Sequence, residues 1–320
     1  MSFSDRVLGF GAFPNRDTTY DIDQSVVFSG SQYFHRTPGS ASNQRTWTWS
    51  GWVKRGNITD GFQVLWSAYD DSTTNDSHYF NVGFTASDTL SVNSWSSNWR
   101  ITNRVFRDPS AWYHVVVVLD TTDSTANDRV KVYINGVQET SFGTFNNPDE
   151  DEELGINKAQ QHRLGATNYS TGSGPYYYKG YMAEVHFIDG TAVAASAFGE
   201  TDSDTGEWVP KAYNTSSGAY GTNGFYLKFV EGAEGTDSSG EGNNYTAVDG
   251  SSNDIDEKVM LDTPTNNFPV INPLFPNLTT SPSTSEGNLV LSGRASTYTT
   301  AVGTIAVSYT HLTLPTTPYV

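Results

Sequence analysis

Apolar and polar residues alternate with a period of two along most of the first 200 residues, as they do in half-buried β-strands. Thr46–Lys54 alternates clearly, and Asn135-Gly136, at the end of another alternating run, predicts a hairpin turn. Trp112–Asp120 is apolar almost throughout, which predicts a central strand buried on both faces. A helical pattern is confined to about two turns near Val193–Phe198. Strands that recur every 8–12 residues or so predict an all-β sandwich or barrel.

The composition changes near residue 200, where the strand-rich region gives way to a segment rich in Gly, Ser, Asp and Asn. That segment holds one convincing strand, Asn223–Phe229, which we expect to pair back on the preceding β-domain. Several prolines over residues 264–287 predict an extended linker. The predicted parts are an N-terminal arm (1–21), the β-domain (22–200), an irregular extension (201–268), the linker with the first strands of a second β-domain (269–307) and a final tail (308–320).

The charge balance argues against two classes of partner. Asp and Glu number 35 against 18 Lys and Arg, so the net charge is −17 and the chain lacks the basic stripe that phosphate contacts require. The same balance disfavours docking on an anionic membrane surface, and no apolar run approaches the roughly 18 residues of a membrane span. We therefore expect neither nucleic-acid binding nor membrane insertion. Aromatic residues make up 13% of the chain, which favours a packed core over disorder.

Cysteine is absent, so disulfide bonds, thiolate catalysis and cysteine-based metal sites are excluded. Carboxylate-rich loops are the remaining candidates for a cation. Asp120, Asp123 and Asp128 flank one predicted hairpin loop, and calcium takes six to eight oxygen ligands, which such a loop can partly supply. Calcium is therefore the one candidate cofactor, with a solvated acidic loop as the alternative interpretation.

Aromatic residues in predicted loops are the candidates for ligand binding. Trp95 lies in one such loop, and Tyr176 and Tyr177 lie in another. Sugar rings present C–H faces that stack on aromatic side chains, so this pattern is typical of glycan-binding surfaces. Trp99 has two interpretations, either a further loop aromatic or a buried residue of the strand that begins there.

Five motifs, in order along the predicted β-domain, resemble the laminin-G-like, concanavalin-type jelly roll. Ser25–Tyr33 is similar to its opening strand, and Thr48–Lys54 to its aliphatic–x–Trp–Val–Lys strand. Ala111–Asp120 and Val132–Val137 resemble its Trp–x–His–Val and Tyr–x–Asn–Gly pair, and Gly180–Phe187 resembles its closing strand. The resemblance implies a two-layer antiparallel β-sandwich.

A second set of motifs resembles bacteriophage tail and tail-fibre proteins of aquatic metagenomes. These stretches are Arg107–His114, Phe187–Gly190, Phe198–Asp202, Tyr220–Phe229 and Asp262–Phe268. A second sandwich of the SPRY type often follows in such proteins, and Gly287–Val307 resembles its first strands. Residues 308–320 resemble translated sequencing-adapter read-through, which implies a truncated chain with a non-native tail.

No catalytic residues are expected. Glucanases on a related sandwich carry two Glu and an intervening Asp at alternate positions of one strand, whereas here Glu184 is followed by His186 and an apolar Ile188. The spacing predicts that Glu184 and His186 share one face of the strand, with Asp189 on the other.

The resemblance implies a non-enzymatic virion component, a phage tail or tail-fibre module made in the host cytoplasm. Its partners would be host-surface glycans and other tail proteins, and analogy with phage fibres implies a homotrimer. Two alternatives stay open: a polysaccharide depolymerase, which is a glycoside hydrolase on the same fold, and a purely structural spacer without a ligand.

Overall fold

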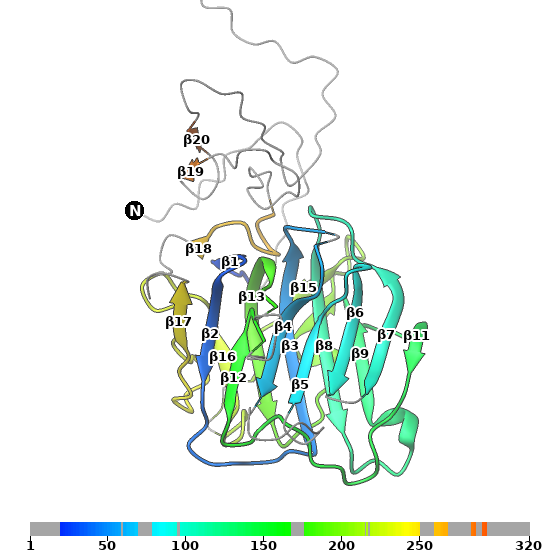
Figure 1. Cartoon of the computed structure of the whole chain (residues 1–320). Helices are drawn as coiled ribbons and strands as arrows, with labels where there is room; N and C mark the ends of the chain where they lie inside the picture. Colours follow the sequence, from blue (N-terminus) through cyan, green and yellow to red (C-terminus); the bar gives the residue numbers. More distant parts are fainter. Residues whose placement is uncertain are drawn as a thin grey trace, which may run out of the picture.

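The computed structural model describes residues 20–58, 60–69, 79–94, 97–167, 176–214, 216, 218–249, 259–267, 283–285 and 290–292. Two antiparallel β-sheets stack face to face, so the fold is an all-β, two-layer sandwich, as the alternating sequence and the motif order predict (Figure 1). Among the described residues, the short helices η2 (Ala126–Asp128) and η3 (Ala195–Ala197) are single 3-10 turns. Within this part of the chain, no helix has the length and apolar character to cross a membrane.

Each sheet has eight strands. Sheet A contains, in spatial order, β10 (Val137–Gln138), β9 (Val130–Ile134), β8 (Trp112–Asp120), β3 (Thr46–Arg55), β13 (Lys179–Asp189), β1 (Ser25–Ser29) and β18 (Val259–Met260), with β16 (Phe225–Leu227) paired to β13. Sheet B contains β11 (Phe142–Phe145), β7 (Asn98–Val105), β6 (Thr89–Ser94), β5 (Tyr79–Phe84), β4 (Gln63–Tyr69), β12 (Gln161–Leu164), β2 (Gln32–Arg36) and β17 (Thr246–Asp249). Two further pairs join β14 (Gly199–Thr201) to β15 (Trp208–Pro210) and β19 (Ser283–Ser285) to β20 (Val290–Ser292).

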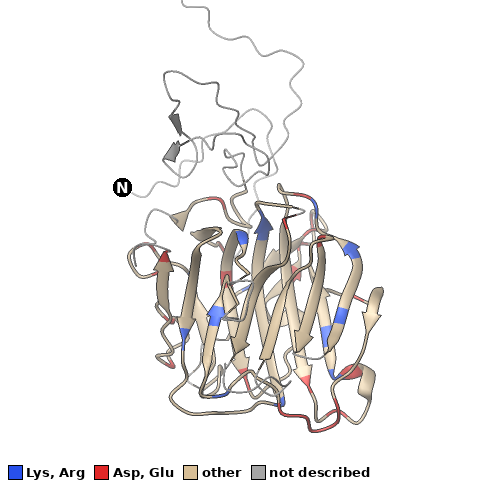
Figure 2. Ribbon diagram, viewed as in Figure 1, with Lys and Arg blue, Asp and Glu red and all other residues tan. Residues whose placement is uncertain are grey.

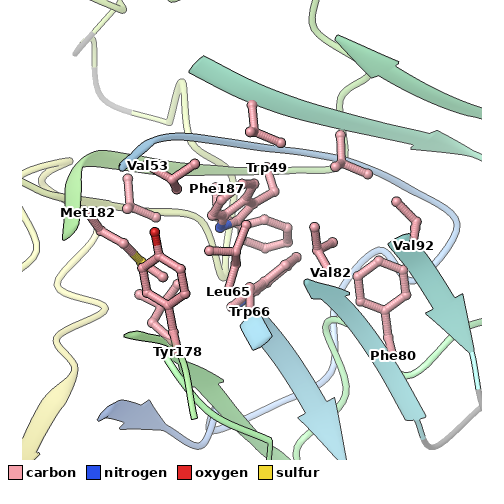
Figure 3. Packing of buried hydrophobic residues seen from close by; sticks show 14 of the residues in the cluster. Trp49, Val53, Leu65, Trp66, Phe80, Val82, Val92, Tyr178, Met182 and Phe187 are labelled. Carbon is pink, nitrogen blue, oxygen red and sulfur yellow. The ribbon is translucent and has the colours of Figure 1, made fainter. Parts of the chain in front are cut away.

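The main core lies between the two sheets and is dominated by aromatic side chains (Figure 3). On β3 the alternation Thr-Trp-Thr-Trp turns Trp47 and Trp49 inward, where both are fully buried. Trp66 of β4 meets them from the opposite sheet, with its ring centroid 5.6 Å from that of Trp47 and 6.4 Å from that of Trp49. An aromatic side chain buries about 150–250 Å². Large aromatic rings therefore contribute much of the buried apolar surface in a chain of which only 36% of the residues are hydrophobic.

β8 and β9 pair antiparallel across the predicted hairpin loop that Asp120 and Asp128 flank, with Val115 opposite Ile134. Val115 and Val117 point into the main core, whereas Val116 belongs to a second buried cluster on the outer face of sheet A. β8 is therefore buried on both faces, which confirms the prediction from its continuous apolar sequence.

Residues beyond 200 cover the outer face of sheet A. The sequence predicts one strand that pairs back on the sandwich, but the structure has three: β16 pairs with β13, β18 with β1, and β17 with β2. The prediction found β16, whose three residues are all buried and apolar, but missed β17 and β18, which are as short or nearly so and are mostly not buried. Tyr220 and Tyr226 of this extension pack with Ile188 of β13. The extension is therefore part of the buried structure of the sandwich.

Polar contacts fasten the end of the extension to the sandwich. Lys54 Nζ of β3 lies 2.7 Å from Asp262 Oδ2, and Trp112 Nε1 donates to Asp262 Oδ1 at 3.1 Å. The backbone N–H of Ile22 donates to Thr265 Oγ1 at 2.9 Å, and that hydroxyl donates to the Ile22 carbonyl at 3.2 Å. The segment that enters the sandwich and the segment that leaves it therefore lie side by side.

Several predicted parts fall outside the described residues. These are the N-terminal arm before residue 20, the tail 308–320, and all of the linker and second β-domain apart from the β19–β20 pair.

Candidate functional site

Two neighbouring strands of sheet B place polar and aromatic side chains on its outer face. β12 pairs with β2 on one side and with β4 on the other, and its Arg163 lies opposite His35 of β2. Alternation along β2 turns Phe34 into the core, so Tyr33 and His35 point outward, and Gln161 and Arg163 do the same on β12. These outward side chains are half-buried.

The guanidinium group of Arg163 lies over the ring of Tyr33, with its carbon 4.4 Å from the ring centroid. Arg163 Nε donates to Gln161 Oε1 at 2.7 Å, and Nη1 donates to the Thr167 carbonyl at 3.0 Å. The ring of Tyr177 lies beside that of Tyr33, with 6.4 Å between centroids. We name this group the Tyr33 patch and define it as Tyr33, His35, Gln161, Arg163 and Tyr177.

The electrostatic state of the patch follows from its partial burial. Burial and the nearby charge of Arg163 lower the pKa of His35, so its ring is neutral at pH 7. Gln161 Nε2 donates to His35 Nδ1 at 3.3 Å, which places the ring proton on Nε2. Burial raises the pKa of Tyr177, so its hydroxyl stays protonated. The patch therefore combines aromatic faces with fixed N–H donors, which is the chemistry that recognises a sugar ring and its substituents.

The structure separates the aromatic residues that the sequence grouped together. Tyr177 belongs to the Tyr33 patch, but Tyr176 packs edge-on against Phe62 at 5.6 Å between centroids and is 37% exposed. Trp95 lies outside the described residues. Trp99 is 2% exposed in the main core, so the buried interpretation of that residue is the correct one.

The patch residues on β2 and β12 were not predicted from the sequence. The signal was present, because Gln32–Arg36 and Gln161–Leu164 both alternate between core residues and polar or aromatic ones. What the sequence does not show is that these two short strands are neighbours.

Each of the three carboxylates that are calcium candidates makes a local contact with a residue two or three positions further along the chain. Asp120 Oδ1 accepts from the Thr122 hydroxyl at 2.6 Å, and Asp123 Oδ1 accepts from a backbone N–H two residues ahead at 2.8 Å. Asp128 Oδ1 faces Lys131 Nζ at 3.3 Å. Across the described ranges, no three His, Asp or Glu side chains are gathered in a way that could hold a metal ion. The three candidates are therefore not brought together, because local hydrogen bonds and an ion pair hold their oxygens.

Glu184 and His186 lie together on the outer face of sheet A, as their spacing predicts. β13 bulges between Ala183 and His186, and Glu184 adopts a left-handed backbone conformation with φ +49°. Its Oε2 lies 3.6 Å from His186 Nε2 and accepts hydrogen bonds from the hydroxyls of Tyr20 at 2.7 Å and Tyr226 at 2.5 Å. This cluster joins Tyr20, which precedes β1, and Tyr226 of the extension to sheet A.

The chemistry of the Glu184 cluster suits a structural role. Burial alone would raise the pKa of Glu184, but the contacts with His186 and with the two tyrosine hydroxyls outweigh burial and hold that pKa below its usual value. A general acid of glycoside hydrolysis needs a raised pKa and a second carboxylate across the scissile bond. Asp189 is engaged elsewhere, since it accepts from Asn157 Nδ2 at 2.8 Å and from the Asn223 backbone at 2.9 Å.

Several solved structures are similar to this chain. A SAP-like pentraxin from Limulus polyphemus is 16% identical with a TM-score of 0.41, over 60% of this chain and 94% of the pentraxin. A putative carbohydrate binding protein from Bacteroides ovatus is 17% identical with a TM-score of 0.38, over 55% and 45% of the two chains. The CBM40 of a Ruminococcus gnavus IT-sialidase is 13% identical with a TM-score of 0.36, over 50% and 89%.

Sequence comparison gives a family. No curated protein matches the chain. The model of the Laminin_G_3 family, described as "Concanavalin A-like lectin/glucanases superfamily", matches residues 28–197, which is more than half of the 320 residues. The match begins near the end of β1 and includes all the strands from β2 to β13, which form most of both sheets. The chain therefore belongs to the concanavalin A-like lectin/glucanases superfamily.

Proposed function

We propose that this chain binds glycans through the Tyr33 patch and does so without catalysis. The observation that carries the proposal is the stack of Arg163 on Tyr33 at 4.4 Å, with the Tyr177 ring at 6.4 Å beside it. Stacking fixes the plane of the guanidinium group, so little side-chain entropy remains to be lost when a ligand binds. The Tyr177 ring supplies a face for the C–H groups of a sugar, a contact of about 0.5–1.5 kcal/mol by analogy with aromatic pairs.

The absence of catalysis is part of the proposal. Its support is the lowered pKa of Glu184 and the enclosure of that carboxylate by Tyr20, Tyr226 and His186. The competing depolymerase would need two carboxylates in an open groove. A reducing-end assay on the polysaccharide that binds distinguishes the two, since only a depolymerase releases new ends.

The biological setting that we propose is a phage tail or tail fibre. Its support is the resemblance of motifs such as Asp262–Phe268 to such proteins. A shallow patch buries little of a sugar, so single-site affinity should be on the order of millimolar. Useful adhesion to a host surface would then require several copies, and a homotrimer beside other tail proteins supplies them through effective concentration.

Replacing Tyr177 by alanine should weaken binding of bacterial O-chain and capsular polysaccharides about three- to tenfold, because the stacking surface is lost. Tyr176→Ala is the matched control, since the neighbouring tyrosine packs on Phe62 outside the patch and its loss should leave affinity unchanged. The measurement is titration of an immobilised polysaccharide array, with thermal melts to show that both variants are folded.

The same titration tests whether glycan binding depends on calcium, the cofactor that the carboxylates around Asp120 suggest. EDTA should leave the affinity unchanged, because none of the side chains of the Tyr33 patch is a carboxylate.

Two results would contradict the proposed site. Equal losses of affinity for Tyr177→Ala and Tyr176→Ala would place the glycan site elsewhere, and an array without any bound polysaccharide would favour the structural spacer.

A further inference from the structure

The strands of sheet B differ in charge from the rest of the chain. Acidic residues outnumber basic ones by 35 to 18 overall, yet Asp249 is the sole carboxylate within the strands of this sheet. Figure 2 shows Lys or Arg on β2, β12 and β7, with the acidic residue at the end of β17. The basic residues of these strands are all arginines: Arg36, Arg100, Arg104 and Arg163.

Arg163 differs from the other arginines in where it points. Arg36 and Arg100 are directed into the protein, where amide and carbonyl oxygens accept their hydrogen bonds. Arg104 lies towards the far edge of the sheet, 3.0 Å from Glu139. Arg163 faces outward on β12, the third strand from the β17 edge of sheet B, with His35 directly opposite on β2.

The carboxylate nearest to the patch along these strands is already engaged. Asp249 follows Val248, the partner of Tyr33 in the β2–β17 ladder, and its Oδ1 accepts from Gln32 Nε2 at 2.6 Å. The side chains of the Tyr33 patch themselves bring one fixed positive charge, Arg163, one imidazole ring with a lowered pKa, His35, and no negative charge.

We infer that the glycan bound at the Tyr33 patch is acidic, with a carboxylate or sulfate group on Arg163 and a sugar ring against Tyr177. This inference rests on the proposed glycan binding and adds the chemical class of the ligand. A planar guanidinium held on an aromatic ring presents N–H groups in fixed geometry, which suits the paired oxygens of a carboxylate or sulfate.

The net charge of −17 does not prevent such binding. At about 0.15 M salt the Debye length is about 8 Å, so exposed charges farther away than that repel the ligand only weakly. The charge of Arg163 therefore dominates the electrostatic energy of a bound anionic group. The negative charges on the rest of the surface mainly slow the approach of a polyanion.

The test titrates acidic polymers and their neutral counterparts onto wild type. The carboxylated probes are polygalacturonate, hyaluronan and polysialic acid, each paired with its carboxyl-reduced form, and dextran sulfate paired with dextran is the sulfated arm. We expect at least one acidic polymer to bind while its neutral counterpart does not, and the arm that binds identifies the anionic group.

Variants connect the charge preference to the patch. Arg163→Gln should weaken binding of the acidic polymer about five- to tenfold, and Arg163→Lys should recover part of the loss because it restores charge without the planar fork. Arg104→Gln, on the same sheet but away from the patch, should change nothing. Melting curves confirm that each variant is folded.

The outcomes distinguish this inference from the proposed function. If neutral polymers bind as well as acidic ones and Tyr177→Ala still weakens them, the patch binds glycans but the acidic class is wrong. If Arg163→Gln and Arg104→Gln have equal effects, the charge preference does not come from the patch. If neither an acidic nor a neutral polymer binds, both the inference and the proposed function fail.

Discussion

Replacing Asp262 by alanine should lower the free energy of unfolding by about 3–5 kcal/mol, because it leaves the buried ammonium group of Lys54 without its counter-ion. The side chains of the pair are 0% and 1% exposed, with 2.7 Å between Nζ and Oδ2. Burial lowers the pKa of Lys54 and raises that of Asp262, because it disfavours the charged form of each group. The attraction between the two charges offsets this cost of burial. Trp112 Nε1 would lose its acceptor as well. Chemical denaturation measures the change.

Two controls separate this effect from ordinary surface electrostatics. Lys179 and Asp60 form a Lys–Asp pair whose side chains are 32% and 39% exposed, so Asp60→Ala should cost less than about 1 kcal/mol. Lys54→Met combined with Asp262→Leu should recover most of the stability, because an apolar pair avoids the uncompensated charge. A loss below about 1 kcal/mol in Asp262→Ala would show that this buried ion pair does not fasten the end of the extension to the sandwich.

Lowering the pH from 7.5 to 5.5 should destabilise the fold by about 3 kcal/mol through two buried histidines. Burial lowers the pKa of His114 to about 3 and that of His162 to about 4, against about 6.5 in the unfolded chain. Below pH 6.5 the unfolded state therefore binds protons that the folded state does not, and stability falls as the pH falls. Each ring contributes about 1.4 kcal/mol over the one pH unit from 6.5 to 5.5.

The contacts of these rings explain why they stay neutral. Trp208 Nε1 donates to His114 Nδ1 at 3.0 Å, and the backbone N–H of Asn157 donates to His162 Nε2 at 3.1 Å, so protonation at either nitrogen breaks a hydrogen bond. The raised pKa of Asp262 has the opposite effect on stability. The folded state binds a proton at this carboxyl more readily than the unfolded state does, so protonation of Asp262 at low pH favours the fold.

Thermal melts across this pH range test the histidine effect. A shift of about 3 kcal/mol corresponds to roughly 10 °C in a domain of this size. His114→Gln and His162→Gln should each flatten the pH dependence by about half, whatever their effect at pH 7.5. A melting temperature that stays constant from pH 7.5 to 5.5 would show that both histidines titrate normally.

The sequence predicts the sandwich well where strands are long and their burial is regular. The alternation that buries Trp47 and Trp49, and the continuous apolar run around Val117, are both direct signals of side-chain orientation. Lys54 shows where such signals fail. An alternating pattern places a lysine at an outward position, but the extension covers that face and encloses it with Asp262.

The Tyr33 patch could not be predicted because it depends on strand register. Arg163 meets His35 only because β12 pairs with β2, and pairing between strands far apart in sequence leaves no trace in either strand alone. Tyr177 was among the predicted ligand residues as a loop aromatic, but the sequence does not indicate that its ring lies beside Tyr33 while that of Tyr176 turns to Phe62.

Hydroxyl-radical footprinting with and without the polysaccharide that binds most tightly tests the central claim most directly, since it locates the contact on the protein. Tyr33 and Tyr177 should become protected, whereas Tyr133 and Tyr213, which are also half-buried but pack on the outer face of sheet A, should react as before. Protection of Tyr133 or Tyr213 with unchanged Tyr33 and Tyr177 would contradict a glycan site on sheet B.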